Sequence, residues 1–322
     1  MDGWQSKAVI IGLLVIIVGI PVLYRPAAAV VEDDAAQIVI LTPHNEQIRY
    51  ETGEAFRRWH REKFGQDVDM QWRSVGGTSD IERLLFSQYR VLAEEGRLQE
   101  GSGYDMVFGG GTYFFRKLAR GIDGVPLLQP AELDPQLIEE VYPGRTLAGS
   151  KLYDAEQGLW YAVVLSSFGI VYNNDLLYHL NSEPPTGWKD LADPKYFGWI
   201  ALADPSHSGS VRATYNAVVQ WYGWERGWKT LRRACANSRY FAHGSSRVPV
   251  DVSQGEAVMG VCIDFYGRFQ SQMVGEAEVE AVGDEPRIEY IAPEAGTAYD
   301  GDPIAILQGA PNKVIAKRFI EF

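Results

Sequence analysis

Residues 201–215 read ALADPSHSGSVRATY, in which an apolar run passes through a polar turn into a helical pattern. Pro205 ends the run as a strand, because proline has no ladder N–H and holds its predecessor extended. Ser208 or Ser210 can cap the helix that follows. Such a turn directs backbone N–H groups and hydroxyls to the positive end of a helix dipole, where an anion is stabilised. The pattern predicts a ligand-binding loop of Ser206, Ser208, Gly209 and Ser210, although a capped loop without a ligand explains it equally well.

A second loop of the same kind follows another predicted strand, at residues 68–72. The loop reads GGTSD at 76–80 and opens a helix at Ile81. Its glycines let the backbone approach a ligand closely, and its hydroxyl and carboxyl side chains can cap the helix. We therefore add Gly77, Thr78 and Ser79 to the candidate ligand-binding residues.

Strands that end in glycine, serine or threonine loops recur along the chain. A third example is the predicted strand at 104–108, which runs into GGG at 109–111. This alternation of strands and helices is typical of an α/β fold with a largely parallel sheet, whose ligands lie beyond the carboxyl ends of the strands. We also expect a helix that follows Glu46 and runs to about Phe64, and a short helix around 135–141.

Residues 160–172 read WYAVVLSSFGIVY and form a long β-prone run with a Ser166-Ser167 break in its middle. The run is too long for one ordinary strand. Its length suits a segment that leaves one domain and enters the next. Because it would pass between the domains, Ser166 is a further candidate for ligand binding.

Composition and charge narrow the class of protein. A chain of 322 residues is long enough for two domains, and its net charge of −12 argues against a nucleic-acid partner. Residues 8–24 form an apolar run followed by small residues, which predicts a secretory signal at 1–29 with cleavage near Ala29. The run is also at the short limit of a membrane-spanning helix, so an uncleaved anchor is the alternative.

Several residue patterns indicate packing rather than chemistry. Cys235 and Cys262 each lie in an apolar stretch and are interpreted as buried small residues, with a single disulfide as the alternative. Trp224, Trp228 and Leu231 recur at helical spacing, which predicts a face packed on the core, with stacking of the tryptophans on a sugar as the alternative. The sequence has no nucleophile elbow, zinc-protease motif, phosphate-binding loop or dinucleotide fingerprint. We expect neither catalytic residues nor a cofactor.

Seven blocks in one order cover most of residues 37–322. They read ILTPHNEQIRYETGEAF, VGGTSDIERLL, YDMVFGGGTYF, SSFGIVYNNDLL, ADPSHSGSVRATYNAVVQWYGWERGW, SQGEAVMGVCIDFY and DGDPIAILQGAPNKVIAKRFIEF. In order and spacing they resemble exported solute-binding proteins of ABC importers, of the class that includes ferric-ion-binding proteins. The resemblance implies a two-lobed α/β fold of the type II periplasmic-binding-protein kind, with a hinge of crossing strands. We place the first lobe at 37–165 and 268–322 and the second at 166–267.

The resemblance also implies residues for a metal ligand. In the ferric-binding relatives, adjacent tyrosines and a histidine or acidic residue near the first strand hold the ion. Tyr266 matches the second tyrosine, Asp264 stands just before the pair, and His44 and Glu46 take the N-terminal positions. Phenolate, carboxylate and imidazole suit a hard trivalent cation. Phe265 replaces the first tyrosine, and this leaves a phosphonate, sugar phosphate or other small organic anion as the alternative ligand.

The function implied is that of a periplasmic or extracytoplasmic receptor, monomeric and non-catalytic. It would capture ferric iron, or the alternative anion, and deliver it to an ABC transporter permease, touching the membrane only through its N-terminal segment. An enzyme on the same fold and a membrane-tethered sensor are the other classes considered. Relatives usually continue beyond the position of Phe322 through further helices that brace the lobes. We therefore expect either a fragment of a longer protein or a protein that lacks these helices.

Overall fold

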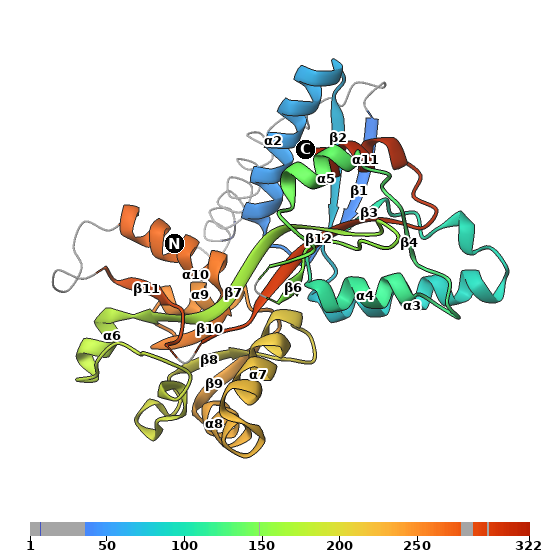
Figure 1. The fold of residues 1–322 in the computed structure, drawn as a ribbon. Coiled ribbons are helices and arrows are strands. Elements are labelled where there is room, and N and C mark those ends of the chain that lie inside the picture. Colours follow the sequence, from blue (N-terminus) through green and yellow to red (C-terminus); the bar gives the residue numbers. More distant parts are fainter. Residues whose placement is uncertain (1–6, 8–35, 148, 278–285, 295) are drawn as a thin grey trace. The chain divides into compact units, whose positions relative to one another are not determined.

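The structure is a computed structural model that describes residue 7 and residues 36–147, 149–277, 286–294 and 296–322 (Figure 1). The expected signal or anchor at 8–24, with its cleavage position, lies outside the described residues. Among the residues that are described, no helix is both long and apolar enough to cross a lipid bilayer. Residues 36–322 form one compact unit.

The first lobe is built on parallel strands β1 (Ala36–Leu41), β2 (Val68–Arg73) and β3 (Met106–Phe108), in the order β2-β1-β3. Strand β12 (Tyr299–Leu307) continues this sheet antiparallel to β3, and β4 (Leu128–Gln129) pairs with β12. The helices of this lobe are α2 (Glu46–Phe64), α3 (Thr78–Glu94), α4 (Thr112–Arg120), α5 (Pro135–Val141) and α11 (Lys313–Glu321), with a 3-10 turn η1 (Leu98–Glu100) and a hairpin of β5 (Thr146–Leu147) and β6 (Ser150–Lys151).

Local sequence signals set the ends of the helices. The Asn45 side chain accepts a hydrogen bond from the N–H of Ile48 at 3.1 Å and so caps the start of α2. Gly65 ends the same helix in the left-handed region, at φ 68°, which only glycine adopts without strain. The helices predicted to end at about Phe64 and to lie around 135–141 are confirmed, and the first of them already begins at Glu46.

The second lobe contains the parallel strands β8 (Ile200–Ala203), β9 (Ser238–Ala242) and β10 (Met259–Ile263), in the order β10-β8-β9. Strand β11 (Ile288–Ile291) belongs to the same sheet through its pairing with β7. The helices are α6 (Asn174–His179), α7 (Gly209–Tyr222), α8 (Trp224–Asn237), α9 (Arg247–Ser253) and α10 (Asp264–Ala277), with 3-10 turns η2 (Asp190–Ala192) and η3 (Pro194–Tyr196).

The two lobes share strands β7 (Tyr161–Asn173) and β12, which run between them in Figure 1. Residues 161–167 of β7 pair antiparallel with β12, whereas residues 168–173 pair antiparallel with β10 and β11. The long β-prone run of the sequence is therefore one 13-residue strand that changes partners at Ser167. It leaves one lobe and enters the other as a single continuous strand.

Each lobe has an apolar core of its own. In the first lobe, buried residues such as Ile40, Met106 and Ile306 pack between the sheet and helices α2 and α11. In the second lobe, buried residues such as Ile200 and Val261 pack against α7 and α8. Separate cores joined by two strands leave the lobes free to change their separation while each stays folded.

Two details differ from the sequence-based expectations. The boundary expected at 267/268 cuts through α10, and both α10 and β11 pack in the second lobe, where Ile288 joins the buried cluster with Val171. The prediction that Trp224 and Trp228 pack on the core is wrong, because their side chains are 71% and 43% exposed, whereas Leu231 is buried as predicted. Cys235 and Cys262 are free thiols, and Cys262 is buried as expected.

Candidate functional site

A cavity of about 340 Å³ lies where the strand ends and loops of the two lobes face each other. The first lobe contributes backbone and side chains from the starts of α3 and α4 and from β12. The second lobe contributes the start of α7 and the loop before α9. The lining residues with polar side chains are His44, Thr78, Tyr113, Ser166, Ser208, Ser210, Arg212, Asn216, Ser245, Ser246, Tyr266, Asp300 and Asp302.

Two helices begin at this cavity. Helix α3 starts at Thr78, directly after Gly77, and α7 starts at Gly209, where the Ser208 side chain accepts the N–H of Val211 at 3.4 Å. The first N–H groups of a helix have no partner within it, and the helix dipole adds positive potential there. The cavity therefore meets two helix N-termini, one from each lobe.

Serine hydroxyls form a chain along the second-lobe wall. Ser208 Oγ lies 3.0 Å from Ser210 Oγ, which in turn lies 2.8 Å from Ser245 Oγ. Ser245 belongs to the loop that follows β9, the parallel neighbour of β8. Sequence analysis missed Ser245 and Ser246, although GSS at 244–246 after a strand is the same small-residue signal as in the two predicted loops.

Arg212 supplies a positive charge to this wall. Its guanidinium carbon lies 5.5 Å from the ring centroid of Tyr113, which projects from the first lobe. Within the described part of the chain, no carboxylate lies within ion-pair distance of Arg212. An arginine that lines a cavity without a carboxylate partner can bind an anion there.

The opposite wall carries two carboxylates from β12. The Gly110 N–H donates to Asp302 Oδ1 at 2.8 Å, and the Thr112 hydroxyl donates to Asp300 Oδ1 at 2.5 Å. Burial raises the pKa of Asp300 above its usual value, against the hydrogen bonds from Thr112. Burial acts the same way on Asp302, but the charge of His44 and the backbone N–H groups outweigh it, and the pKa of Asp302 is lowered.

His44, Tyr266 and Asp302 meet at one end of the cavity. His44 Nε2 lies 3.0 Å from Asp302 Oδ2, which is within ion-pair distance. The contact does not have the geometry of a hydrogen bond. Burial and the nearby charge of Asp302 raise the pKa of the Tyr266 phenol, so that group is a neutral hydroxyl at neutral pH. The ring of Phe265 lies 6.2 Å from that of His44 and offers no ligand atom.

The structure brings together eight of the twelve residues predicted from the sequence. Those that line the cavity are His44, Gly77, Thr78, Ser166, Ser208, Gly209, Ser210 and Tyr266. The Ser166 hydroxyl, for example, donates to the Asp300 carbonyl at 3.3 Å.

The other four predicted residues lie outside the lining. Glu46 is exposed in the first turn of α2, and Ser206 is exposed in the turn before α7. The Asp264 carboxylate accepts a hydrogen bond from the Ser167 hydroxyl at 2.9 Å and another from the backbone N–H of Phe265, in the first turn of α10. Ser79 is buried, and its N–H donates to the His207 carbonyl.

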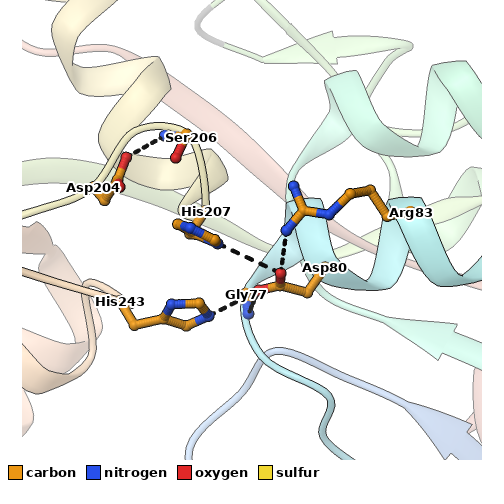
Figure 2. Close-up of polar contacts among 7 residues, drawn as sticks. All are labelled: Gly77, Asp80, Arg83, Asp204, Ser206, His207 and His243. Carbon is orange, nitrogen blue, oxygen red and sulfur yellow. Dashed lines mark hydrogen bonds and ion pairs between the residues drawn. The ribbon is translucent and has the colours of Figure 1, made fainter.

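A polar cluster lies beside the cavity, at the point where α3 faces the second lobe (Figure 2). Asp80 accepts the Gly77 N–H and lies within ion-pair distance of Arg83, His207 and His243. Burial would raise the pKa of Asp80, but the Gly77 N–H and the two histidines outweigh it, and the pKa is lowered. None of these residues other than Gly77 lines the cavity.

Residues 126–322 match the sequence pattern of the family of bacterial extracellular solute-binding proteins. The chain belongs to this family. Members of an extracellular family act outside the cytoplasm, in agreement with the expected location.

Curated relatives of this solute-binding protein match over part of their length. Phosphoglycerate transport regulatory protein PgtC of Salmonella typhimurium is 31% identical over 105 residues, which are 33% of this chain and 26% of the relative. An uncharacterized protein of Haemophilus influenzae is 26% identical over 162 residues, 50% of this chain and 44% of that protein. The alignments thus span less than half of each relative.

Solved structures share the fold of this solute-binding protein. The periplasmic binding protein AfuA of Actinobacillus pleuropneumoniae, solved with fructose 6-phosphate, is 20% identical with a TM-score of 0.67, covering 89% of this chain and 78% of AfuA. The ferric binding protein of Campylobacter jejuni is 18% identical with a TM-score of 0.60, covering 88% and 80%. At these identities the likeness concerns the fold alone, and it confirms the two-lobed α/β prediction.

Proposed function

We propose that this solute-binding protein is the receptor of an ABC importer and captures a small phosphorylated hydroxy compound between its lobes, for delivery to a permease. The observation that carries the proposal is the convergence of two helix N-termini, a chain of serine hydroxyls and Arg212 on one cavity. We further propose that residues 1–29 export the chain and that the receptor is not an enzyme.

The phosphate group would lie against α7 and α3. The N–H groups of Gly209 and Ser210 occupy the first turn of α7, where helix geometry leaves them without intrahelical partners. The hydroxyls of Thr78 and Ser208 are further donors at the same place. A phosphate oxygen accepts such bonds and pairs with the Arg212 guanidinium, and charge-assisted bonds of this kind are about twice as strong as neutral ones.

The hydroxyl groups of the ligand would face Asp300 and Asp302. Carboxylates repel a bare anion but accept hydrogen bonds from sugar or glycerate hydroxyls. The two walls therefore select a molecule with an anionic end and a hydroxylated end. The volume of about 340 Å³ falls within the range of roughly 300–1,000 Å³ usual for small-molecule sites.

Two relatives support this ligand class. The name of PgtC refers to phosphoglycerate transport, and AfuA was solved with fructose 6-phosphate. Both compounds join a phosphate to hydroxyl groups, as the two walls of the cavity require.

Binding would favour the closed arrangement of the lobes. The Ser79 N–H already donates to the His207 carbonyl of the other lobe at 3.3 Å, beside the cavity. A ligand that contacts both lobes binds the closed form more tightly than the open form. It shifts the equilibrium by as much as that difference in affinity.

Ferric iron is the second candidate, favoured by the meeting of His44, Tyr266 and Asp302 at one end of the cavity. Imidazole, phenolate and carboxylate are donors that suit the ion. The set is weaker than that of the ferric-binding class, because Glu46 is exposed away from the cavity and Phe265 replaces a tyrosine.

Thermal unfolding of the full chain with fructose 6-phosphate, 3-phosphoglycerate, inorganic phosphate and ferric citrate tests the proposal. A ligand at a hundredfold excess over its dissociation constant raises the unfolding free energy by about 2.7 kcal/mol. Stabilisation by a phosphorylated compound, with no product formed on incubation, supports the receptor. Stabilisation by ferric citrate alone, with a visible phenolate–iron absorption lost in Tyr266→Phe, establishes the second candidate, and turnover of the compound establishes an enzyme.

A further inference from the structure

Three side chains of the polar cluster, Asp80, His207 and His243, come from different elements of the two lobes (Figure 2). Asp80 lies in the first turn of α3, whereas His207 and His243 follow β8 and β9. These strands are parallel neighbours that pair up to Ala203 and Ala242, so the residues just beyond their carboxyl ends lie together. The cluster therefore connects the first lobe to two loops of the second lobe.

The distances within the cluster are short enough for its three side chains to hold one metal ion. His243 Nε2 lies 2.9 Å from Asp80 Oδ2, and His207 Nδ1 lies 3.4 Å from Asp80 Oδ1. One ligand atom from each residue lies within 4.8 Å of the others. Two donors on a tetrahedral zinc ion, with bonds of about 2.0–2.1 Å, are roughly 3.3 Å apart.

The His207 ring supplies a second observation. Its Nδ1 atom is buried and, among the residues that the structure describes, has no hydrogen-bond partner, because its approach to Asp80 is outside hydrogen-bond geometry. The His207 and His243 rings lie close, with centroids 4.2 Å apart, and both face the carboxylate. A buried nitrogen without a partner is costly, and a cation between the three groups would satisfy it.

The donor types restrict the ion. Two imidazoles and a carboxylate suit zinc, copper or nickel, whereas magnesium and calcium prefer oxygen ligands alone. Three protein ligands leave a fourth tetrahedral position for water, as in other zinc sites with an open position.

We propose that Asp80, His207 and His243 bind a divalent transition-metal ion of the zinc class, and that this ion fastens the two lobes in the closed arrangement. The ion is distinct from the transported ligand, because none of the three residues lines the cavity. Moving the lobes apart separates the histidine pair from Asp80. The closed form therefore offers three ligands and the open form at most two, so the ion favours closure.

Arg83 competes with the ion. Its guanidinium pairs with Asp80 Oδ1, the same oxygen that faces His207. The Arg83 side chain is 61% exposed and can turn into solvent when an ion binds. The variant Arg83→Gln is therefore expected to bind the ion more tightly than the wild type.

The test is a calorimetric titration of the full chain with zinc chloride, in the absence of any organic phosphate, together with small-angle scattering. We expect one ion per chain and a smaller radius of gyration in its presence. Loss of outer-shell partners alone weakens metal binding about 10–100-fold, so His207→Ala and His243→Ala should each weaken it at least tenfold. His243 is 58% exposed, so its replacement leaves the fold intact. His179→Ala is the matched control, since His179 is exposed on α6.

Three results would overturn the proposal. They are an absence of zinc binding, equal binding by the wild type and His243→Ala, and an equal loss in His179→Ala, which identifies adventitious binding at exposed histidines. Binding without a change in the radius of gyration refutes the fastening of the lobes. The titration needs no transported ligand, so its outcome is independent of the ligand class proposed above.

Discussion

Replacing Arg212 by glutamine removes the positive charge from the serine-lined wall of the cavity and keeps a side chain of similar length. Arg212 has no carboxylate partner within the described residues, and its stacking on Tyr113 is a weak contact. The variant should therefore fold as the wild type does, with an unchanged unfolding temperature. Its effect should fall on the anionic end of the ligand.

The size of that effect follows from the lost interaction. A hydrogen bond to a charged group contributes about 1.5–3 kcal/mol, and each 1.4 kcal/mol changes a dissociation constant tenfold. Arg212→Gln should thus weaken the binding of fructose 6-phosphate by about 10- to 100-fold. Isothermal titration calorimetry measures this directly, and fructose without its phosphate should bind both proteins equally weakly.

The matched control for Arg212→Gln is Arg232→Gln, since Arg232 is exposed on α8 and does not line the cavity. It should bind fructose 6-phosphate as the wild type does, which excludes a general effect of net charge. Equal affinity of Arg212→Gln and the wild type would refute the assignment of the phosphate to this wall. So would an equal loss in Arg232→Gln.

Three further substitutions test the closure, the core and the carboxylates. Gly77→Ala should weaken ligand binding and leave a larger radius of gyration, because its Cβ would lie 2.4 Å from the His207 carbonyl oxygen of the other lobe. Ile306→Ala should lower the unfolding free energy by about 2–5 kcal/mol in a denaturant titration, because Ile306 is fully buried in the first-lobe core. Asp302→Asn should lower stability at neutral pH and make acid unfolding less steep below about pH 4, because a carboxylate with a lowered pKa stabilises the fold only while ionised.

Each of these substitutions has a control. Gly187→Ala places its Cβ in open space, and an equal effect on binding would contradict the reasoning for Gly77. Val314 is 64% exposed, so Val314→Ala should change stability little, and a comparable loss would contradict the core argument. Asp300 has a raised pKa, so its ionisation costs stability as the pH rises. Asp300→Asn should therefore make the protein more stable at neutral pH. A loss of stability in both Asp300→Asn and Asp302→Asn would refute the opposite pKa shifts of the two carboxyl groups.

The loops of the site were predictable because their signals are local. A strand, a glycine or serine turn and a helix start follow one another in one short stretch at 68–81 and again at 200–211. Their meeting at one cavity is not a local property, because β2 and β8 belong to different lobes and are related only through the antiparallel pairings of β12, β7 and β10 between them. The β propensity of 160–172 predicted a segment that passes between the lobes, but the Ser166-Ser167 break gave no sign that it would be the single strand β7.

Other site residues carry no local signal. Asp300 and Asp302 belong to β12, and they reach the cavity because β12 inserts next to β3, some 190 positions earlier in the chain. The grouping of Asp80 with His243 depends in the same way on contacts between the lobes. Helical spacing identified one face of α8 but could not tell whether another element covers Trp224, which in the structure stays exposed.

The position of β12 in the sheet has a consequence for the order in which the protein can fold. Strand β12 lies between β3 and β7, yet it follows both of them by more than 120 residues along the chain. During synthesis from the N-terminus, the sheet has a gap at its centre until residues 299–307 leave the ribosome. The backbone edges of β3 and β7 that pair with β12 then stay unpaired, and such long-range pairing is slow to form. A nascent chain of this topology therefore cannot complete the sheet that joins its two lobes before residues 299–307 have emerged.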